Sequence, residues 1–262
     1  MGDSARTIVL TIAGSDSGGG AGIQADLKTF ARFGVYGTSV ITAVTAQNTR
    51  AVSAVEALSP GIVAAQIAAV VDDFRVAALK TGMLANAAII GAVSRVLRVS
   101  RVGPLVVDPV MVAKSDDRLL DADALDALTR DLLPLAAVVT PNLPEAEVLA
   151  GIPVRTLDDQ REAARRIVAL GARAVVVKGG HAQSSEIVDV LFDGQAFTEF
   201  RGERVPGTST HGTGCTFSAA IAAQLALGRG IQEAIPLAQA YVAKAIRNAP
   251  GLGGGHGPMG HL

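Results

Sequence analysis

Short apolar runs alternate with helical patterns of apolar residues along nearly the whole chain. The runs are rich in Val, Ile, Leu and Thr and lack strict apolar–polar alternation, which indicates strands buried on both faces. They predict strands at residues 7–13, 38–44, 77–79, 105–107, 136–140 and 174–177. The helical patterns predict helices at residues 22–33, 60–74, 85–98, 122–133, 157–170, 213–227 and 231–248, with Pro236 expected to kink the last one or delay its start.

This alternation of strand and helix is typical of a parallel sheet covered by helices on both faces, a three-layer α/β/α fold. One region departs from it. Residues 187–192 and 196–200 flank the turn signal Asp193-Gly194 and predict an antiparallel pair at one edge of the sheet. No linker, repeat or shift in composition divides the chain, so we expect a single domain over residues 1–262, with the Gly-rich tail 251–262 as loop.

Composition narrows the function classes. The 262 residues are 49% hydrophobic and 18% charged, enough apolar material for a large core, and the net charge of −1 offers no basic excess for nucleic acid or an anionic membrane. We find neither a signal peptide nor an uninterrupted apolar span of membrane length, so the expected location is cytoplasmic. The single cysteine, Cys215, excludes an intramolecular disulfide and a cysteine-cluster metal site.

A glycine-rich segment, residues 14–22, follows the first predicted strand and precedes a helix. Five glycines in this segment would let the backbone approach a ligand and expose N–H groups near the helix start, although a mobile turn is the alternative. The chain contains no Gly-Lys pair, so the segment is not a P-loop. The G-x-G-x-x-G match at residues 255–260 has no strand before it or helix after it, and we reject a dinucleotide site.

The segment His211–Thr216 opens an apolar helix with small residues, which predicts free backbone N–H groups and the positive end of the helix dipole facing an anion. Cys215 lies in this first turn, where a helix start lowers a thiol pKa and makes the residue a candidate proton acceptor. The alternative is a buried structural thiol that packs as a small hydrophobic group.

Other polar residues follow predicted strands: Asp108, the pair Asn142 and Glu145, and Lys178. Each has a structural alternative, since Asn142 and Glu145 form a capping-box pattern and Lys178 could simply end a strand. Together at the carboxyl ends of parallel strands they predict an enzyme site. The four histidines show no paired metal-ligand spacing, which disfavours a metal-dependent hydrolase. Tail residues His256 and His261 are expected to be exposed.

Seven motifs, in this order, closely resemble those of hydroxymethylpyrimidine/phosphomethylpyrimidine kinases, a family of ribokinase-like kinases: AGSDSGGGAGIQADLKT (13–29), TAQNT (45–49), KTGML (80–84), DPVM (108–111), TPNLPEA (140–146), VKGGH (177–181) and HGTGCT (211–216). The resemblance implies a single ribokinase-like α/β/α domain, usually a homodimer. It also implies that ATP and Mg²⁺ support phosphorylation of 4-amino-5-hydroxymethyl-2-methylpyrimidine and then of its monophosphate, in thiamine diphosphate biosynthesis.

The resemblance also implies roles for individual residues. The residues that match the family's pyrimidine pocket are Gly14, Ala21, Asp26, Gln47, Met83 and Val110. Those that match its anion hole are Gly212, Thr213, Gly214 and Cys215. Asn142 and Glu145 match the motif that organises Mg²⁺ and phosphates, Lys178 lies where the family binds nucleotide, and Asp108 is expected to assist Glu145 at the metal.

Two alternatives remain open. A pyridoxal or pyridoxine kinase of the same superfamily shares the Cys-containing anion hole, and Gln47 and Met83 favour the pyrimidine only moderately. A non-catalytic ligand sensor on this fold would have a damaged anion hole or acidic motif, and both are intact here. For Cys215 we form the hypothesis that it assists the first phosphorylation more than the second, because a phosphomonoester is already largely dianionic at neutral pH.

Overall fold

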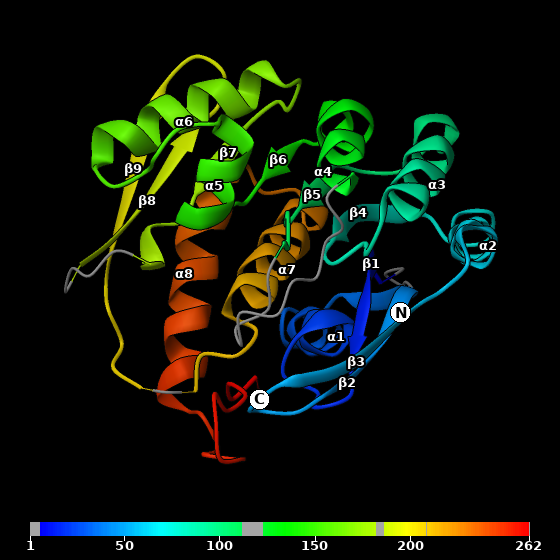
Figure 1. Cartoon of the computed structure of the whole chain (residues 1–262), viewed down its shortest axis with the longest axis horizontal. Coiled ribbons are helices and arrows are strands. Elements are labelled where there is room, and N and C mark those ends of the chain that lie inside the picture. Colours follow the sequence, from blue (N-terminus) through cyan, green and yellow to red (C-terminus); the bar gives the residue numbers. More distant parts are fainter. Residues whose placement is uncertain (1–5, 112–122, 182–185, 208, 262) are drawn as a thin grey trace, which may run out of the picture.

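A computed structural model of the chain describes residues 6–111, 123–181, 186–207 and 209–261. Within this part, nine strands form one sheet in the order β3-β2-β1-β4-β5-β6-β7-β8-β9 (Figure 1). Their bounds are β1 Ile8–Asp16, β2 Tyr36–Gln47, β3 Val52–Ala57, β4 Val76–Thr81, β5 Leu105–Val107, β6 Val138–Val139, β7 Val175–Val177, β8 Glu186–Phe192 and β9 Phe197–Glu203. All the predicted strands are confirmed, with shifted ends.

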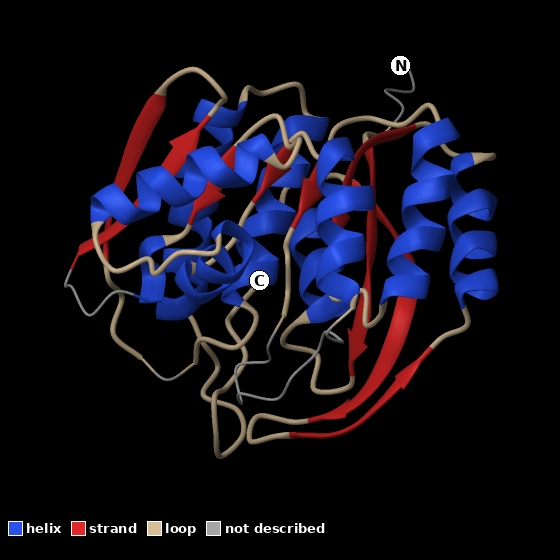
Figure 2. Cartoon of the chain, turned by 45° about the horizontal axis from the view of Figure 1, so that its top comes forward, coloured by secondary structure: helices blue, strands red, loops and turns tan. Residues whose placement is uncertain are grey.

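The central strands β2, β1, β4, β5, β6 and β7 run parallel. The predicted hairpin forms β8 and β9, and β8 pairs antiparallel with β7. An antiparallel strand that the sequence did not predict, β3, pairs with β2 at the opposite edge. Most of its side chains are exposed, so it lacks the apolar run that marks the buried strands. Figure 2 shows the β2–β3 ribbon passing beyond the helices at one end of the molecule.

Helices cover both faces of the sheet, as predicted. One apolar core packs α2, α3, α5 and α6 against it, and the other packs α1, α7 and α8, which lie side by side (Figure 1). The bounds are α1 Gly22–Arg32, α2 Pro60–Val71, α3 Ala87–Val99, α4 Ala124–Ala127, α5 Leu143–Ala150, α6 Leu157–Ala169, α7 Thr213–Ala226 and α8 Ile231–Arg247. This is the three-layer α/β/α arrangement expected from the sequence.

Two predicted helices differ in detail. The helix expected at 122–133 is divided into α4, a π-helical turn (Leu128–Leu132) and a 3₁₀ turn (Leu133–Leu135), and its expected first residue lies outside the described part. Pro236 lies inside α8 and does not delay its start, since the helix begins at Ile231. In the described part, no helix combines the length and apolar character needed to cross a membrane.

The helix starts fall into two groups. Ser59, Asn86, Asn142 and Thr156 cap α2, α3, α5 and α6 by accepting a hydrogen bond from a backbone N–H of the first turn. By contrast, α1 begins after Ala21 and α7 after Gly212, and neither start has a side-chain cap. The starts of α4 and α8 also lack a side-chain cap, but α1 and α7 are the ones that begin in the glycine-rich segments 14–22 and 211–216, which directs attention to the space between them.

Candidate functional site

The chain order of the sheet reverses between β1 and β4, and the crevice at such a reversal is where open α/β sheets bind ligands. Gly14 in β1 and Met83 just after β4 meet there. A Cβ atom on Gly14 would lie 2.5 Å from Met83 Cε, so a larger residue at position 14 would require the Met83 side chain to move. Two residues predicted for the pyrimidine pocket are thus brought together from segments far apart in the sequence.

The glycine-rich segment after β1 is organised by Asp16, which is almost fully buried. Its carboxylate accepts hydrogen bonds from the N–H groups of Gly18 (2.8 Å), Gly20 (3.0 Å) and Ala21 (2.8 Å). The same carboxylate lies 2.9 Å from Nε2 of His211. The expectation that this segment exposes its N–H groups to a ligand is therefore wrong for these three amides. Residues 14–22 instead form a wall of the candidate site, and these three amides are bonded within it.

The pKa of Asp16 fits this role. Burial alone would raise it, but the hydrogen bonds from His211, Ala21 and Gly18 outweigh burial and hold the pKa below its usual value. The carboxylate is therefore ionised at neutral pH and stays an acceptor. Sequence analysis quoted Asp16 within a motif but gave it no role, because its partner His211 is 195 residues away.

The turn at the start of α7 packs directly against that wall. Gly212 has φ of +83°, a conformation that favours glycine, and a Cβ atom there would lie only 1.9 Å from the carbonyl oxygen of Gly20. The backbone N–H of Thr216 donates to the Gly212 carbonyl and closes the first turn. The amides of an uncapped first turn have no partner within the helix and suit an anion. The turn thus has the uncapped start that an anion hole requires, and the anion hole itself stays a prediction.

Polar residues from three other strand ends lie beside this turn. Lys178 Nζ forms a 3.1 Å ion pair with Asp108 Oδ1, and a Cβ atom on Gly214 would lie 3.3 Å from that Nζ and 3.7 Å from Asp108 Oδ2. Asn142 bridges Lys178 through the backbone. Asp108, Lys178 and the α7 turn were predicted as separate candidates, and the structure places them next to one another.

Asn142 and Glu145 form the capping box that sequence analysis gave as the structural alternative. Asn142 Oδ1 accepts from the Glu145 N–H at 2.9 Å, and Glu145 Oε2 accepts from the Asn142 N–H at 2.8 Å. Burial raises the pKa of Glu145 to about 7, against the opposing charge of Lys178. The capping box holds the buried carboxyl of Glu145 beside Asp108 and Lys178. Asn142 and Glu145 therefore cap α5 and also remain candidates for the functional site.

Cys215 is half-buried in the first turn of α7. Burial raises the pKa of its thiol to about 11, and the carboxylates of Asp108 and Asp26 add to the effect, while the charge of Lys80 opposes it. The expectation that the helix start lowers this pKa is therefore wrong. The helix dipole favours a thiolate, but loss of solvent and two nearby negative charges outweigh it.

Beneath the site, Lys80 and Asp26 form a fully buried ion pair of 2.9 Å. Asp26 Oδ2 also accepts from Thr11 Oγ1 at 2.6 Å, whereas Asp26 Oδ1 is buried with no hydrogen-bond partner in the described part. Burial works to lower the pKa of Lys80, but Asp26 holds it above its ordinary value. Asp26 is predicted to bind the pyrimidine. Of its two carboxylate oxygens, only Oδ1 therefore has no hydrogen bond in the described part. Sequence analysis gave Lys80 no role. The signal that could have identified it is a lysine within a short apolar strand.

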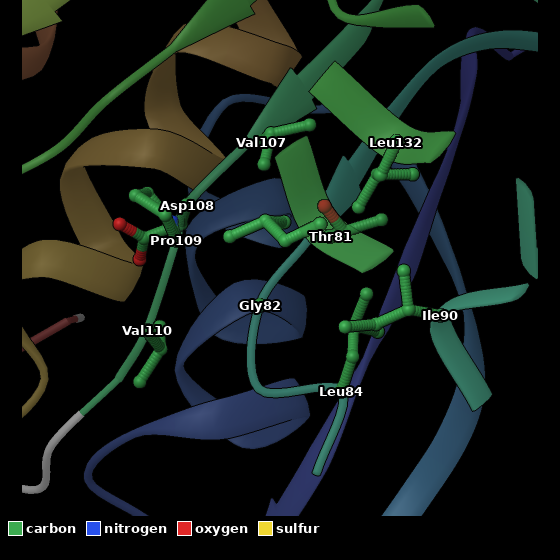
Figure 3. A pocket seen from close by; sticks show the side chains of 10 residues that line it. Thr81, Gly82, Leu84, Ile90, Val107, Asp108, Pro109, Val110 and Leu132 are labelled. Atoms are coloured by element: carbon green, nitrogen blue, oxygen red, sulfur yellow. The ribbon is translucent and has the colours of Figure 1, made fainter. Parts of the chain in front are cut away.

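Gln47 lies at the end of β2 and is linked to the other segments. Its side chain accepts from Thr45 Oγ1 at 3.1 Å and lies 3.4 Å from the imidazole of His211. Val110 follows Asp108 and lines a narrow, mostly apolar hollow with Thr81 and Gly82. Figure 3 shows the Asp108 carboxylate pointing toward α7 and away from the apolar side chains of this hollow. The hollow itself belongs largely to the core, and the polar groups lie on the α7 side.

Comparison with known proteins connects this geometry to a family. A family model described as phosphomethylpyrimidine kinase matches residues 16–260. The chain belongs to this family. It is 53% identical to the hydroxymethylpyrimidine/phosphomethylpyrimidine kinase of Rhizobium meliloti, over 97% of each chain. It is also 53% identical to the thiamine biosynthesis bifunctional protein ThiED of Geobacter sulfurreducens, covering 98% of this chain and 52% of that longer protein.

Comparison with solved structures supports the fold. The Bacillus subtilis pyridoxal kinase in its ADP complex superposes with a TM-score of 0.91 and 41% identity, over 98% of each chain. The ribokinase-like fold expected from the motifs is therefore confirmed, including the antiparallel edge. Identity is higher to the R. meliloti pyrimidine kinase than to this pyridoxal kinase.

Proposed function

We propose that the protein transfers the γ-phosphoryl group of ATP to 4-amino-5-hydroxymethyl-2-methylpyrimidine, and then to the resulting monophosphate, in thiamine diphosphate biosynthesis. The observation that carries this proposal is the uncapped turn Gly212–Cys215, seated against the wall formed by residues 14–22 and beside Asp108 and Lys178. Membership of the phosphomethylpyrimidine kinase family supports the same substrates. The ADP complex of the related pyridoxal kinase supports a nucleotide as phosphoryl donor.

In the proposed reaction, the hydroxymethyl oxygen attacks the γ-phosphorus, the bond to ADP breaks, and the hydroxyl proton leaves. Such a transfer is catalysed mainly by positioning and by stabilising charge on the equatorial phosphoryl oxygens. The amides of Gly214 and Cys215, in the uncapped first turn of α7, are proposed to perform that task, with the ammonium of Lys178 near Gly214. The residues proposed to hold the pyrimidine are Gly14, Ala21, Asp26, Gln47, Met83 and Val110.

The residues also fit Mg²⁺. Asp108 Oδ2 is buried with no hydrogen-bond partner in the described part, and Glu145 supplies a second carboxyl group with a pKa raised by burial. Hard oxygen ligands of this kind suit Mg²⁺, which commonly takes one or two carboxylates and completes its shell with water and substrate phosphates. We propose that Asp108 and Glu145 hold the cation, which would neutralise phosphate charge when bound.

Cys215 is proposed to assist loss of the hydroxyl proton in the first step and to matter much less in the second. Because the pKa of its thiol is about 11, only the small thiolate fraction present at neutral pH can accept that proton. The second substrate is a phosphomonoester that is already largely dianionic and needs no base. The two phosphorylations should therefore depend differently on this side chain.

The direct test is to incubate the protein with ATP, Mg²⁺ and the hydroxymethyl pyrimidine and to follow the products by phosphorus NMR. We expect the monophosphate first and then the diphosphate. Absence of any phosphorylated pyrimidine would refute the proposal. A parallel assay with pyridoxal addresses the second candidate, because the pyridoxal kinase superposes over the whole chain. A large preference for pyridoxal would reverse the choice of substrate.

We further propose that the protein works in the cytoplasm as a homodimer. Apolar side chains on β2 and β3 support an interface there, since Tyr36, Val44 and Val55 are all substantially exposed. Analytical ultracentrifugation tests this directly. A sedimentation coefficient of a monomer at micromolar concentration would refute the dimer without affecting the proposed reaction.

A further inference from the structure

The segment 251–261, which sequence analysis left as an uninterpreted Gly-rich loop, is packed against the site. Met259 and His261 are almost completely buried, so the expectation that His261 is exposed is wrong, whereas His256 is exposed as expected. A Cβ atom on Gly255 would lie 2.1 Å from the Thr49 carbonyl oxygen, and one on Gly260 2.1 Å from that of Asn248. These glycines permit close backbone contact, so the segment is packed against the rest of the protein.

The segment contacts the α7 turn on both sides. Before the turn, the N–H of His211 donates to the Gly257 carbonyl at 3.2 Å, and Pro258 pairs with His211 as an isolated bridge. After it, His261 Nε2 and Thr216 Oγ1 share a buried hydrogen bond of 2.9 Å. The proposed anion-binding residues 212–215 lie between these two attachments.

The other contacts of the segment fix it to the rest of the fold. The N–H of His256 donates to the Thr49 carbonyl at 2.7 Å, two residues beyond Gln47. The N–H of Gly260 donates to the Ala245 carbonyl at 2.9 Å, and Tyr241 Oη donates to the His261 carbonyl at 3.1 Å, both from α8. The segment thus connects the end of β2, the α7 turn and α8.

We propose that residues 251–261 form a strap that positions the phosphoryl-binding turn, and that His261 is its positioning residue, acting through Thr216. This inference rests on the proposed kinase function. Small displacements of groups that bind the transferred phosphoryl reduce turnover strongly, because their interaction strengthens as charge develops. Loss of the His261 contact should therefore lower kcat while the KM values for pyrimidine and ATP change little.

The charge state of His261 is consistent with this role. Burial lowers its pKa to about 4, and the charge of Lys28 acts in the same direction, while a hydrogen bond with the Met259 backbone opposes them. The neutral imidazole presents one donor and one acceptor nitrogen at physiological pH. An exposed tail histidine would titrate near 6.5, so the titration of this ring reports whether the strap is in place.

The test uses the full chain and a double-mutant cycle. We expect His261→Leu and Thr216→Val each to lower kcat about tenfold per folded molecule, with both KM values within about twofold. The double variant should lose no more than either single variant, because both remove the same contact. His261→Gln, which keeps a polar group, should restore most of the activity. Leu252→Ala, at an exposed position of the same segment, is the matched control and should leave kcat unchanged.

The folded fraction of each variant is measured by circular dichroism and by ADP titration. Losses that are additive, or that disappear after correction for the folded fraction, would overturn the proposal. Histidine NMR on the wild type gives a readout that needs no substrate, and a His261 midpoint near 6.5 would also overturn it. If the wild type phosphorylates no pyrimidine, the proposed function fails. The strap is then judged by whether His261→Leu, but not Leu252→Ala, shifts the amide resonances of Gly214 and Cys215.

Discussion

Two glycine-rich segments, residues 14–22 and the α7 turn 211–216, look alike in the sequence but do opposite things with their backbone amides. Both follow the strand–loop pattern of an anion site and precede a helix without a side-chain cap. In the first, the Asp16 carboxylate takes up the N–H groups of Gly18, Gly20 and Ala21. In the second, no carboxylate of the described residues accepts a hydrogen bond from an amide of Gly212–Cys215, although Asp108 lies nearby. An internal acceptor thus decides whether glycine-rich backbone can bind an external anion.

The two segments also depend on each other. The Gly20 carbonyl packs against Gly212, and the Asp16 carboxylate contacts His211, which leads into the α7 turn. The segment whose amides are bonded to Asp16 is therefore the support against which the proposed anion-binding turn is held. Variants that change one segment at a time can separate support from binding.

The largest effect is expected from Gly212→Ala. A Cβ atom would meet the Gly20 carbonyl at 1.9 Å, and the residue has a positive φ, so the turn must move. Displacing phosphoryl-binding amides should lower kcat by at least about a hundredfold. The matched control is Gly34→Ala, which has a φ of +75° with nothing within 4 Å of a Cβ atom. It should lose only about 1–2 kcal/mol of stability and keep its kcat. Equal kinetic losses in both variants would contradict this.

The next effect concerns the supporting segment. Asp16→Asn replaces an acceptor of several backbone amides by a group with fewer acceptor sites, and should cost about 2–3 kcal/mol of unfolding free energy at pH 7. The KM for the pyrimidine should rise about tenfold, because Ala21 moves with the wall. Asp193→Asn, in an exposed turn with two similar amide contacts, is the control and should leave KM unchanged.

The pH dependence gives a second check on Asp16. Its pKa is lowered in the folded state, so its stabilising contribution is complete above the usual carboxyl pKa of 3.8 and is lost as the pH falls through the lowered value. The difference in unfolding free energy between wild type and Asp16→Asn, measured in urea, should therefore narrow below about pH 4. A constant difference down to pH 2 would show that Asp16 stabilises the wall without its charge.

The contrast between these segments also shows which features could not be predicted from the sequence. Periodicity predicted every parallel strand, and the polar residues at strand ends predicted that Asp108, Asn142, Glu145 and Lys178 would gather at one edge of the sheet. Periodicity could not find β3, whose side chains face solvent and whose pairing depends on β2. Nor could it assign Asp16 or His261, because each is defined by a partner far along the chain, His211 and Thr216 respectively.

Cys215 shows the same limit for a chemical property. Local sequence predicted a lowered thiol pKa from the helix start, but burial raises it, and the negative charges of Asp108, just after β5, and Asp26, in α1, add to the rise. Tertiary surroundings outweigh a local dipole here. The positions of candidate residues were therefore better predicted than their protonation states.

A smaller, step-selective effect is expected for Cys215→Ala. The first phosphorylation should slow about tenfold and the second less than about threefold, since only the alcohol must lose a proton. Equal slowing of both steps would contradict the division of labour. The pKa can be checked separately, because Cys215 is the only cysteine of the chain. Its alkylation by iodoacetamide, followed by mass spectrometry, should accelerate with a midpoint near pH 11, and a midpoint below 8 would contradict the burial argument.

The smallest expected effect tests whether residues 14–22 are held in place by the buried Asp16 carboxylate or by exposed contacts such as that of Lys28. Lys28 is exposed, and its Nζ donates a 2.6 Å hydrogen bond to the Gly19 carbonyl from outside the segment. Water replaces such a contact readily, so Lys28→Met should cost less than about 1 kcal/mol and keep kcat and KM within twofold. The comparison with Asp16→Asn is then direct, since both variants remove hydrogen bonds from the same segment. A rise in KM as large as that of Asp16→Asn would mean that the wall is held from its surface, and that its satisfied amides are not what makes it rigid.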